Sequence, residues 1–280
     1  MSTRTRPDRC PGALRPWPAD DGLLVRLRLI GGRIPAAALA ALLAVAEEYG
    51  DGRLHLTGRA NLQLRGLPGA DDALRPDVLA ALEATGLLPT RTHELVRNVM
   101  VSPQTGLAGG RLDLRRVAAE LDRLVCADPA LPALPGRFLF VLDDGRGDLV
   151  DRSCDLGLVA LDEHRVQLRV GEGWGATVPA VEAADALVRL ARDFVARRGS
   201  GPAAPWHVAE LDAPLAPITL RDAEVPAAAA PPPYGPIAGG THVAVPDGVL
   251  DRAGVGALTA AAPELIITPW RGVLVPEERP

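Results

Sequence analysis

The fold is decided by residues 53–66, which read RLHLTGRANLQLRG. Leucine occupies alternate positions on both sides of a short break, at Leu54 and Leu56 and again at Leu62 and Leu64. This period of two predicts two short strands that each bury one face. The break at residues 58–60 joins the strands, so we expect Arg59 at a corner, where binding side chains are commonly presented.

The polar side chains of this stretch suit an anionic ligand. Arg59 and Arg65 carry planar guanidinium groups that pair with carboxylates and do not deprotonate. Thr57 and Gln63 add neutral hydrogen-bonding groups between them. The alternative is a solvated strand face without a ligand, because exposed Arg and Gln residues are common.

The same pattern returns near the C-terminus, in residues 264–275, which read ELIITPWRGVLV. An apolar strand again ends in Thr, and a second apolar strand follows Arg271. A strand, a turn and a helix precede each copy, beginning at residues 23 and 241. We therefore predict an internal repeat in which residues 23–66 and 241–275 superpose and share one composite sheet, with Arg271 as the counterpart of Arg59.

The remaining pattern predicts a mixed helix and sheet protein. Apolar spacing indicates helices over residues 35–49, 76–85, 112–125 and 181–197, and strands over 23–29, 138–142, 156–161 and 165–170. Asp143-Asp144-Gly145 is typical of a hairpin turn, and the glycine-rich residues 171–175 are interpreted as a turn because they lack the dinucleotide-binding spacing. Residues 227–233, AAAAPPP, predict a semi-rigid linker.

Composition excludes several classes of protein. The 280 residues are 48% hydrophobic and 23% charged, which is ordinary for a soluble protein of two or three domains. The net charge is −5 and no lysine or basic run occurs, so nucleic-acid binding has little support. The longest apolar stretch, residues 36–46, is too short to cross a membrane, and the polar N-terminus predicts a cytoplasmic protein without an export signal.

The residues that usually hold metals are scattered. The three cysteines, Cys10, Cys126 and Cys154, form no C-x-x-C pair, and the five histidines form no H-x-x-x-H pair. Asp143, Asp144 and Asp148 are interpreted as solvated turn residues. We therefore predict no metal site, and we assign no catalytic residue.

Five motifs resemble the sulfite/nitrite reductase superfamily, and most closely its precorrin-3B synthase branch. They follow in the family's order: DRCPG at 8–12, the stretch 57–66, RNV at 97–99, PGRF at 135–138 and TPWRG at 268–272. The resemblance implies an α+β fold in which two ferredoxin-like half-domains flank one larger α+β domain. The expected boundaries are 8–88 for the first half-domain, 89–210 for the middle domain, 211–235 for the linker and 236–280 for the second half-domain.

The resemblance also implies a site for a tetrapyrrole. Its positive groups would be Arg59, Arg97 and Arg137, converging on a cleft between the first half-domain and the middle domain. Asn61, Gln63 and Asn98 would lie nearby, and Arg271 would face the place of a further domain. The reductases carry Lys where this sequence has Arg137, and a second Lys where it has Leu139, which favours a carboxylate-rich corrin precursor over sulfite or nitrite.

The family's cofactors are siroheme or a related tetrapyrrole and a [4Fe–4S] cluster. The cluster's cysteines lie in a domain beyond the second half-domain, which we expect to be missing here, and three thiols cannot supply four ligands. The expected function is a precorrin-3B synthase-like oxidoreductase of cobalamin biosynthesis, completed by a separate cluster-bearing polypeptide or electron donor. Two alternatives remain open: a tetrapyrrole-binding module without redox activity, and a sulfite or nitrite reductase fragment.

Overall fold

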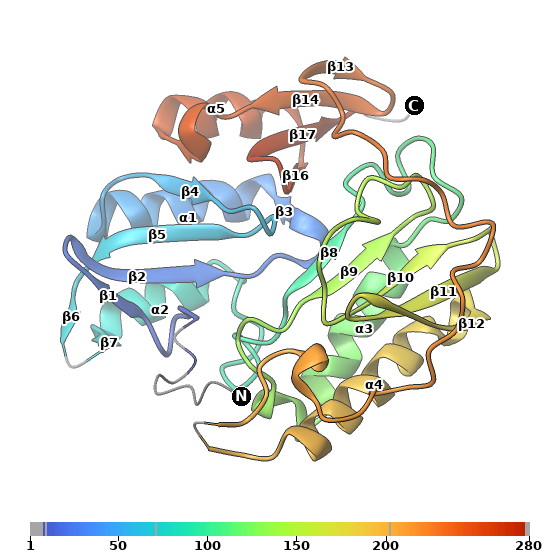
Figure 1. The fold of residues 1–280 in the computed structure, drawn as a ribbon. Coiled ribbons are helices and arrows are strands. Elements are labelled where there is room, and N and C mark those ends of the chain that lie inside the picture. Colours follow the sequence, from blue (N-terminus) through green and yellow to red (C-terminus); the bar gives the residue numbers. More distant parts are fainter. Residues whose placement is uncertain (1–7, 9, 71, 202, 278–280) are drawn as a thin grey trace. The chain divides into compact units, whose positions relative to one another are not determined.

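The chain forms two compact units in a computed structural model, which describes residues 8, 10–70, 72–201 and 203–277. We call residues 95–230, together with Asp8, the middle unit, and residues 10–94 with 231–277 the repeat unit. Both units combine helices with sheets (Figure 1), which confirms the predicted α+β class. No helix among the described residues is long and apolar enough to cross a membrane.

The first half of the repeat unit contains the predicted strand pair. Its elements are β1 (Trp17–Ala19), β2 (Gly22–Leu27), the 3-10 turn η1 (Ile30–Gly32), β3 (Arg33–Pro35), α1 (Ala36–Tyr49), β4 (Leu54–Leu56) and β5 (Leu62–Leu67). A small hairpin of β6 (Gly69–Ala70) and β7 (Ala73–Leu74) then leads to α2 (Pro76–Ala84). The strands and helices predicted over residues 23–85 are confirmed, and only β1 and the short strands β3, β6 and β7 were not foreseen.

The second half repeats the same order of elements. They are β13 (Gly235–Ile237), β14 (Gly240–Ala244), the 3-10 turn η5 (Pro246–Gly248), β15 (Val249–Leu250), α5 (Arg252–Ala261), β16 (Glu264–Ile267) and β17 (Gly272–Pro276). The predicted internal repeat is therefore confirmed. Within the described residues, the second half carries no counterpart of α2.

The two halves form two sheets and not the single composite sheet that we predicted. The strand orders are β1-β2-β5-β4-β15 and β13-β14-β17-β16-β3, so each half gives one short strand to the sheet of the other. The cause lies in the turns η1 and η5, where Gly31 and Gly32, and likewise Asp247 and Gly248, have positive φ angles. This left-handed turn redirects the chain before β3 and before β15.

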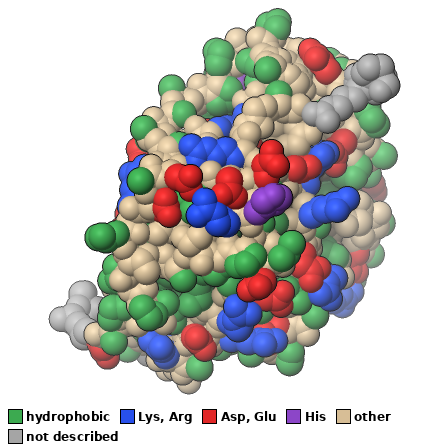
Figure 2. Space-filling view, turned by 90° about the vertical axis from the view of Figure 1, so that its right-hand side faces the viewer, with side chains coloured by type: hydrophobic (Ala, Val, Ile, Leu, Met, Phe, Trp, Pro, Cys, Tyr) green, Lys and Arg blue, Asp and Glu red, His purple; other side chains and the backbone are tan. Residues whose placement is uncertain are grey.

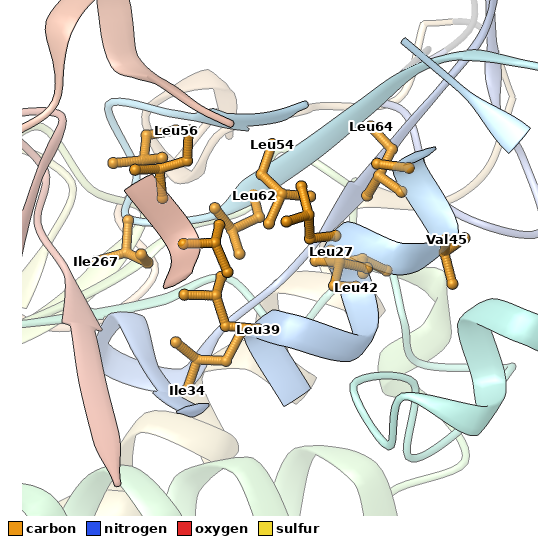
Figure 3. Packing of buried hydrophobic residues seen from close by; sticks show 14 of the residues in the cluster. Leu27, Ile34, Leu39, Leu42, Val45, Leu54, Leu56, Leu62, Leu64 and Ile267 are labelled. Carbon is orange, nitrogen blue, oxygen red and sulfur yellow. The ribbon is translucent and has the colours of Figure 1, made fainter. Parts of the chain in front are cut away.

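One hydrophobic core nevertheless serves both halves. Leu54, Leu56, Leu62 and Leu64 are all buried, as their alternation predicted, and they pack with residues such as Leu27 and Leu39. Figure 3 shows Ile267 of the second half beside these leucines of the first. Full burial of such side chains contributes about 1.5–3 kcal/mol each, which holds the halves together.

The middle unit is built on the sheet β12-β11-β10-β9-β8. Its strands are β8 (Val99–Val101), β9 (Phe140–Asp143), β10 (Leu156–Ala160), β11 (Arg165–Val170) and β12 (Gly173–Pro179), and its helices are α3 (Arg115–Ala127) and α4 (Ala183–Arg198). Short 3-10 turns occur at η2 (Leu131–Ala133), η3 (Ala180–Glu182) and η4 (Val208–Glu210). The glycine-rich stretch turns at Gly171 as predicted, but from Gly173 it is already part of β12.

Asp143 and Asp144 contradict the predicted hairpin. β9 and β10 run parallel, and both carboxylates are buried. Asp143 accepts hydrogen bonds from the backbone N–H groups of Gly145, Gly147 and Leu149, and Asp144 forms an ion pair with Arg146. The two aspartates are therefore buried residues that stabilise the long connection between β9 and β10, and they are not solvated turn residues. The oxygens of Asp143 accept hydrogen bonds from loop N–H groups that have no backbone acceptor.

Candidate anion-binding site

The corner between β4 and β5 is fixed by Thr57. Its Oγ1 accepts hydrogen bonds from the backbone N–H of Asn61 at 3.1 Å and of Arg59 at 3.3 Å, and its own N–H donates to Asn61 O at 2.9 Å. Ala60 closes the turn with a φ of 56°. These bonds place Arg59, half-buried, at the corner that the sequence predicted.

Asn61 and Gln63 were both predicted beside Arg59, and the structure gives them different tasks. Asn61 is buried, and its Oδ1 accepts the backbone N–H of Leu29 at 2.9 Å, which ties the corner to the segment just after β2. Gln63 is half-buried, and its Oε1 accepts from Arg26 Nε at 3.1 Å and from Nη2 at 2.5 Å. Gln63 thus orients a guanidinium that our sequence reasoning did not select.

Arg26 lies on β2 directly opposite Gln63. Burial lowers its pKa, the nearby Cys10 opposes this shift, and the positive charge of Arg59 lowers the pKa further. No carboxylate lies within ion-pair distance of Arg26 among the described residues. We call these three residues the Arg26–Gln63–Arg59 face. It contains two guanidinium groups that repel each other electrostatically, and the neutral amide of Gln63 is the hydrogen-bond partner of Arg26.

Neighbouring charges on the same sheet are engaged elsewhere. Arg65, two residues beyond Gln63 on the same side of β5, forms an ion pair with Asp21 at 2.9 Å. Arg28 is buried and donates to the backbone carbonyls of Pro11 and Arg26. Alternation along residues 23–29 already put Arg26 and Arg28 on the side of Gln63 and Arg65, and this was the sequence signal that could have found Arg26.

The corner of the second half has the same backbone and different side chains. Thr268 Oγ1 accepts the N–H of Gly272 at 3.2 Å, Thr268 N–H donates to Gly272 O at 2.9 Å, and Arg271 closes the turn with a φ of 59°. Arg271 therefore matches Ala60, and Trp270 matches Arg59. Our prediction that Arg271 is the counterpart of Arg59 is wrong by one position, because the left-handed residue sets the register.

An aromatic group replaces the cations in the second half. His242 takes the strand position of Arg26 and pairs across the sheet with Leu274, the counterpart of Gln63. The His242 ring stacks on Tyr234 with centroids 4.5 Å apart, and its Nε2 lies 3.0 Å from Thr268 Oγ1. Burial lowers the pKa of His242. Among the residues that the structure describes, the cationic face therefore occurs in the first half alone.

The other predicted site residues lie in the middle unit. Arg97 is buried and forms a bidentate ion pair with Asp122, at 2.7 and 2.8 Å. Asn98 is buried and donates from Nδ2 to the carbonyls of Leu95 and Gly136. Arg137 is exposed and lies over the ring of Trp206, 5.8 Å from its centroid. Their convergence with Arg59 on one cleft stays a prediction.

The thiols do not fit a [4Fe–4S] cluster. Cys10 belongs to the repeat unit, and burial raises the pKa of Cys126 and raises that of Cys154 to about 11, against the thiolate that iron requires. Among the described residues, one group of metal-ligand type occurs, and it is Asp143, Asp144 and Asp148 without a cysteine. Those carboxylates are occupied by Arg146, Ser102 and backbone N–H groups.

Charges on the face seen in Figure 2 do not gather by sign. On the face seen in Figure 2, acidic and basic side chains are interspersed over the middle of the view. That face therefore offers no extended basic patch of the kind that follows a nucleic-acid backbone. The Arg26–Gln63–Arg59 face is distinguished by two neighbouring guanidinium groups, one of which, Arg26, is held by a neutral amide, and not by a large excess of arginines.

Known proteins resemble this chain over its first half-domain and over its fold. Residues 18–84 match the nitrite/sulfite reductase ferredoxin-like half domain. A precorrin-3B synthase from Sinorhizobium sp is 43% identical over 61 residues, which cover 22% of this chain and 13% of that protein. A ferredoxin–nitrite reductase from Synechococcus elongatus is 34% identical over 134 residues, which cover 45% of this chain and 26% of that protein.

The fold has a solved counterpart in the NirA protein of Mycobacterium tuberculosis. Its structure matches with a TM-score of 0.71 and 19% sequence identity, covering 90% of this chain and 53% of NirA. The matched part of this chain thus spans about half of NirA and about a quarter or less of the curated relatives. The architecture described above is therefore a known arrangement.

Proposed function

We propose that this chain, a member of the sulfite/nitrite reductase superfamily, binds the carboxylates of a tetrapyrrole through its first ferredoxin-like half-domain. The function that fits best is that of a precorrin-3B synthase-like oxidoreductase of cobalamin biosynthesis. Its redox step would depend on a cluster-bearing polypeptide or another electron donor. A tetrapyrrole-binding module without redox activity is the second candidate, favoured by thiols that do not fit a cluster.

The Arg26–Gln63–Arg59 face is the observation that carries this proposal. Two half-buried guanidinium groups repel each other, and burial magnifies that repulsion because water screens it less. A ligand with several carboxylates relieves it, since each charge-assisted contact contributes about 1.5–3 kcal/mol. The internal partner, Gln63, is neutral, so it holds Arg26 in place without satisfying its charge.

The middle unit supports a large anion over a small one that must be reduced. At the positions where the reductases carry lysines, this chain has the exposed Arg137 and the buried Leu139. Arginine remains protonated, so these groups can orient and neutralise an anion but cannot deliver protons to it. Removal of cationic proton donors weakens the case for nitrite or sulfite reduction, although curated relatives include nitrite reductases.

Titration of uroporphyrin against point variants tests the proposed site. We expect Arg26→Ala and Arg59→Ala each to weaken binding about ten-fold to a hundred-fold, with a smaller effect at high salt. Arg65→Ala is the matched control, because Arg65 is on the same side of the same sheet but is neutralised by Asp21. Equal losses in all three variants would show nonspecific attraction and would end the proposal.

The same titration asks how far the site extends. Losses in Arg97→Ala and Arg137→Ala would support the single cleft predicted with the middle unit. Arg271→Ala should bind normally, since Arg271 occupies the place of Ala60 and not that of Arg59. If Arg271→Ala weakens binding as much as Arg59→Ala does, the ligand spans both halves of the repeat unit.

Anaerobic reconstitution separates the two candidate functions. The chain alone should bind fewer than four irons and four sulfides stoichiometrically and should show no broad cluster absorbance, because its three thiols cannot supply four ligands. Iron and acid-labile sulfide near four per chain would contradict this. Oxygen-dependent turnover of a precorrin after addition of a cluster-bearing polypeptide would favour the enzyme, and binding without turnover would favour the module.

A further inference from the structure

Three arginines are almost fully buried among the described residues, and one of them has a nitrogen atom without a hydrogen-bond partner. Arg28 donates to two backbone carbonyls, and Arg97 is paired with Asp122. Arg169 is 5% exposed, and its Nη1 atom is buried and finds no acceptor in the part of the chain that the structure describes. A buried charge without a partner is strongly destabilising, so this arginine requires an explanation.

Strand pairing fixes the side of the middle unit's sheet on which Arg169 lies. Val170, the next residue of β11, is level with Phe140 of β9. Phe140 contacts Phe138, which in turn contacts Phe194 of α4, so that side of the sheet faces the helix. Because side chains alternate along a strand, Arg169 projects from the opposite side and takes no part in the packing against α4.

The strands beside Arg169 supply no acceptor to its guanidinium. Arg169 pairs with Gly157 of β10, which has no side chain, and with Trp174 of β12. Its guanidinium carbon lies 5.8 Å from the centre of a Trp174 ring, whose face attracts a cation but offers no oxygen to an N–H group. The register of β11 against β12 shifts between Gln167 and Arg169, and such bulges commonly re-aim a side chain beside a functional site.

Two carboxylates act on the same thiol as Arg169 but do not neutralise the arginine. Burial raises the pKa of Cys154 to about 11, the positive charge of Arg169 opposes this rise, and the negative charges of Asp155 and Glu172 add to it. Asp155 accepts two backbone N–H groups, at 2.9 and 3.3 Å, and Glu172 is exposed. Within the described ranges, neither forms an ion pair with Arg169.

We propose that Arg169 binds a carboxylate group of a small-molecule ligand on this side of the sheet. A carboxylate supplies both the acceptor that Nη1 lacks and the negative charge that the guanidinium lacks. The low exposure of Arg169 limits the contact to the end of the ligand, and it strengthens the contact because water is largely excluded. The site is independent of the tetrapyrrole proposal, since the Arg26–Gln63–Arg59 face belongs to the repeat unit.

The first test compares Arg169→Met with Arg97→Met. Both changes replace a buried arginine of the middle unit by a neutral side chain, but Arg97 has the carboxylate partner Asp122. Without ligand, Arg169→Met should raise the melting temperature by about 2–6 °C, because it removes an unpaired buried charge. Arg97→Met should lower it, because Asp122 loses its partner. A lower melting temperature in both variants would show that Arg169 is satisfied within the protein and would overturn the proposal.

The second test follows the Arg169 Nε–H signal by NMR, identified by its absence from the spectrum of Arg169→Met. Propionate and uroporphyrin are the probes, with sodium chloride at matched ionic strength as the control that should leave the signal in place. A saturable shift with uroporphyrin would identify a tetrapyrrole carboxylate as the ligand, and a shift with propionate alone would identify a separate small carboxylic acid. No shift with either probe would overturn the proposal.

The same titration in Arg26→Ala separates this site from the anion-binding face of the repeat unit. The shift of the Arg169 signal should persist unchanged in that variant, even if uroporphyrin no longer binds at the Arg26–Gln63–Arg59 face and propionate is the probe that reports it. Loss of the shift in Arg26→Ala would assign the response to the other face and would equally contradict a carboxylate site at Arg169.

Discussion

The corners at Thr57 and Thr268 share one backbone and carry opposite chemistry. Each begins with a Thr whose hydroxyl accepts the N–H four residues ahead, and each ends with a residue of positive φ, Ala60 or Arg271. The side chains presented around the first corner are Arg26, Gln63 and Arg59, and those around the second are His242, Leu274 and Trp270. The repeated positions are those that shape the corner, and the positions that differ include those that we propose contact a ligand.

This difference separates structural residues from binding residues without an alignment. A residue present in both halves at the same position, such as Thr57 and Thr268, is explained by the corner itself. A charged residue present in one half, such as Arg26, has no such explanation and is a candidate for binding. The comparison therefore supports the Arg26–Gln63–Arg59 face, and it demotes Arg271 to a corner residue.

The largest expected effect contrasts Gly32 with its counterpart Gly248. Both have φ near 70°, so replacement by Ala strains either backbone by about 1 kcal/mol. A Cβ on Gly32 would lie 2.0 Å from the backbone oxygen of Ile267, whereas a Cβ on Gly248 would first meet the Arg271 side chain at 3.1 Å. Gly32→Ala should lower the free energy of unfolding by at least about 3 kcal/mol, and Gly248→Ala by about 1–2 kcal/mol.

Urea unfolding of the two glycine variants measures this difference. The circular dichroism of the middle unit serves as an internal reference if the two units unfold at separate urea concentrations. Equal losses of stability in both variants would mean that the turns before β3 and before β15 leave equally little space for a Cβ atom. The asymmetry between the halves would then be limited to their ligand-facing side chains.

A smaller effect is expected at the two threonines. Thr268 is fully buried, and Thr268→Val leaves the Gly272 N–H and the His242 ring nitrogen without their hydroxyl partner, which costs about 2–3 kcal/mol. Thr57 is half-buried, so water can replace its hydroxyl and Thr57→Val should cost about 1 kcal/mol. Thermal unfolding of both variants measures the two losses of stability. A larger loss for Thr57→Val than for Thr268→Val would contradict this prediction.

The smallest effect concerns pH. Burial lowers the pKa of His242 below its ordinary 6.5, so the folded state binds that proton less readily than the unfolded state. Stability of the second half is therefore complete above about pH 6.5 and falls as the pH drops below that value. Hydrogen exchange corrected for intrinsic rates should accelerate in β14 between pH 7 and pH 5 and stay unchanged in β2, whose Arg26 keeps its charge. Equal acceleration in both strands would assign the effect to other groups.

The sequence predicted local structure and repetition well, because both arise from near neighbours. Alternating leucines placed β4 and β5, and the strand–turn–helix order revealed both halves. The exchange of β3 and β15 between sheets was not predictable in this way, since it depends on positive φ values at residue pairs such as Asp247 and Gly248. The periodicity of apolar residues does not indicate the direction that the chain takes after a turn.

The errors on individual residues have the same origin. Asp143-Asp144-Gly145 has the composition of a hairpin turn, but the partners of Asp143 are backbone groups up to six residues ahead, and these become visible only once the loop has folded. Arg271 was matched to Arg59 because both are arginines that follow a Thr. The two corners are instead equivalent in the spacing between the Thr and the residue of positive φ, which is Ala60 in one corner and Arg271 in the other. Whether Arg97 and Arg137 join Arg59 depends on how the two units meet, which local pattern does not determine.

The exchanged strands impose an order on synthesis. β15 pairs with β4 and β3 pairs with β16, so neither sheet of the repeat unit can be completed until residues 249–267 have left the ribosome. The middle unit, by contrast, draws its strands β8–β12 from one continuous segment and can fold while translation continues. During that interval the first half waits with unpaired strand edges, which makes the nascent chain, and not the finished protein, the state most exposed to aggregation and to chaperones.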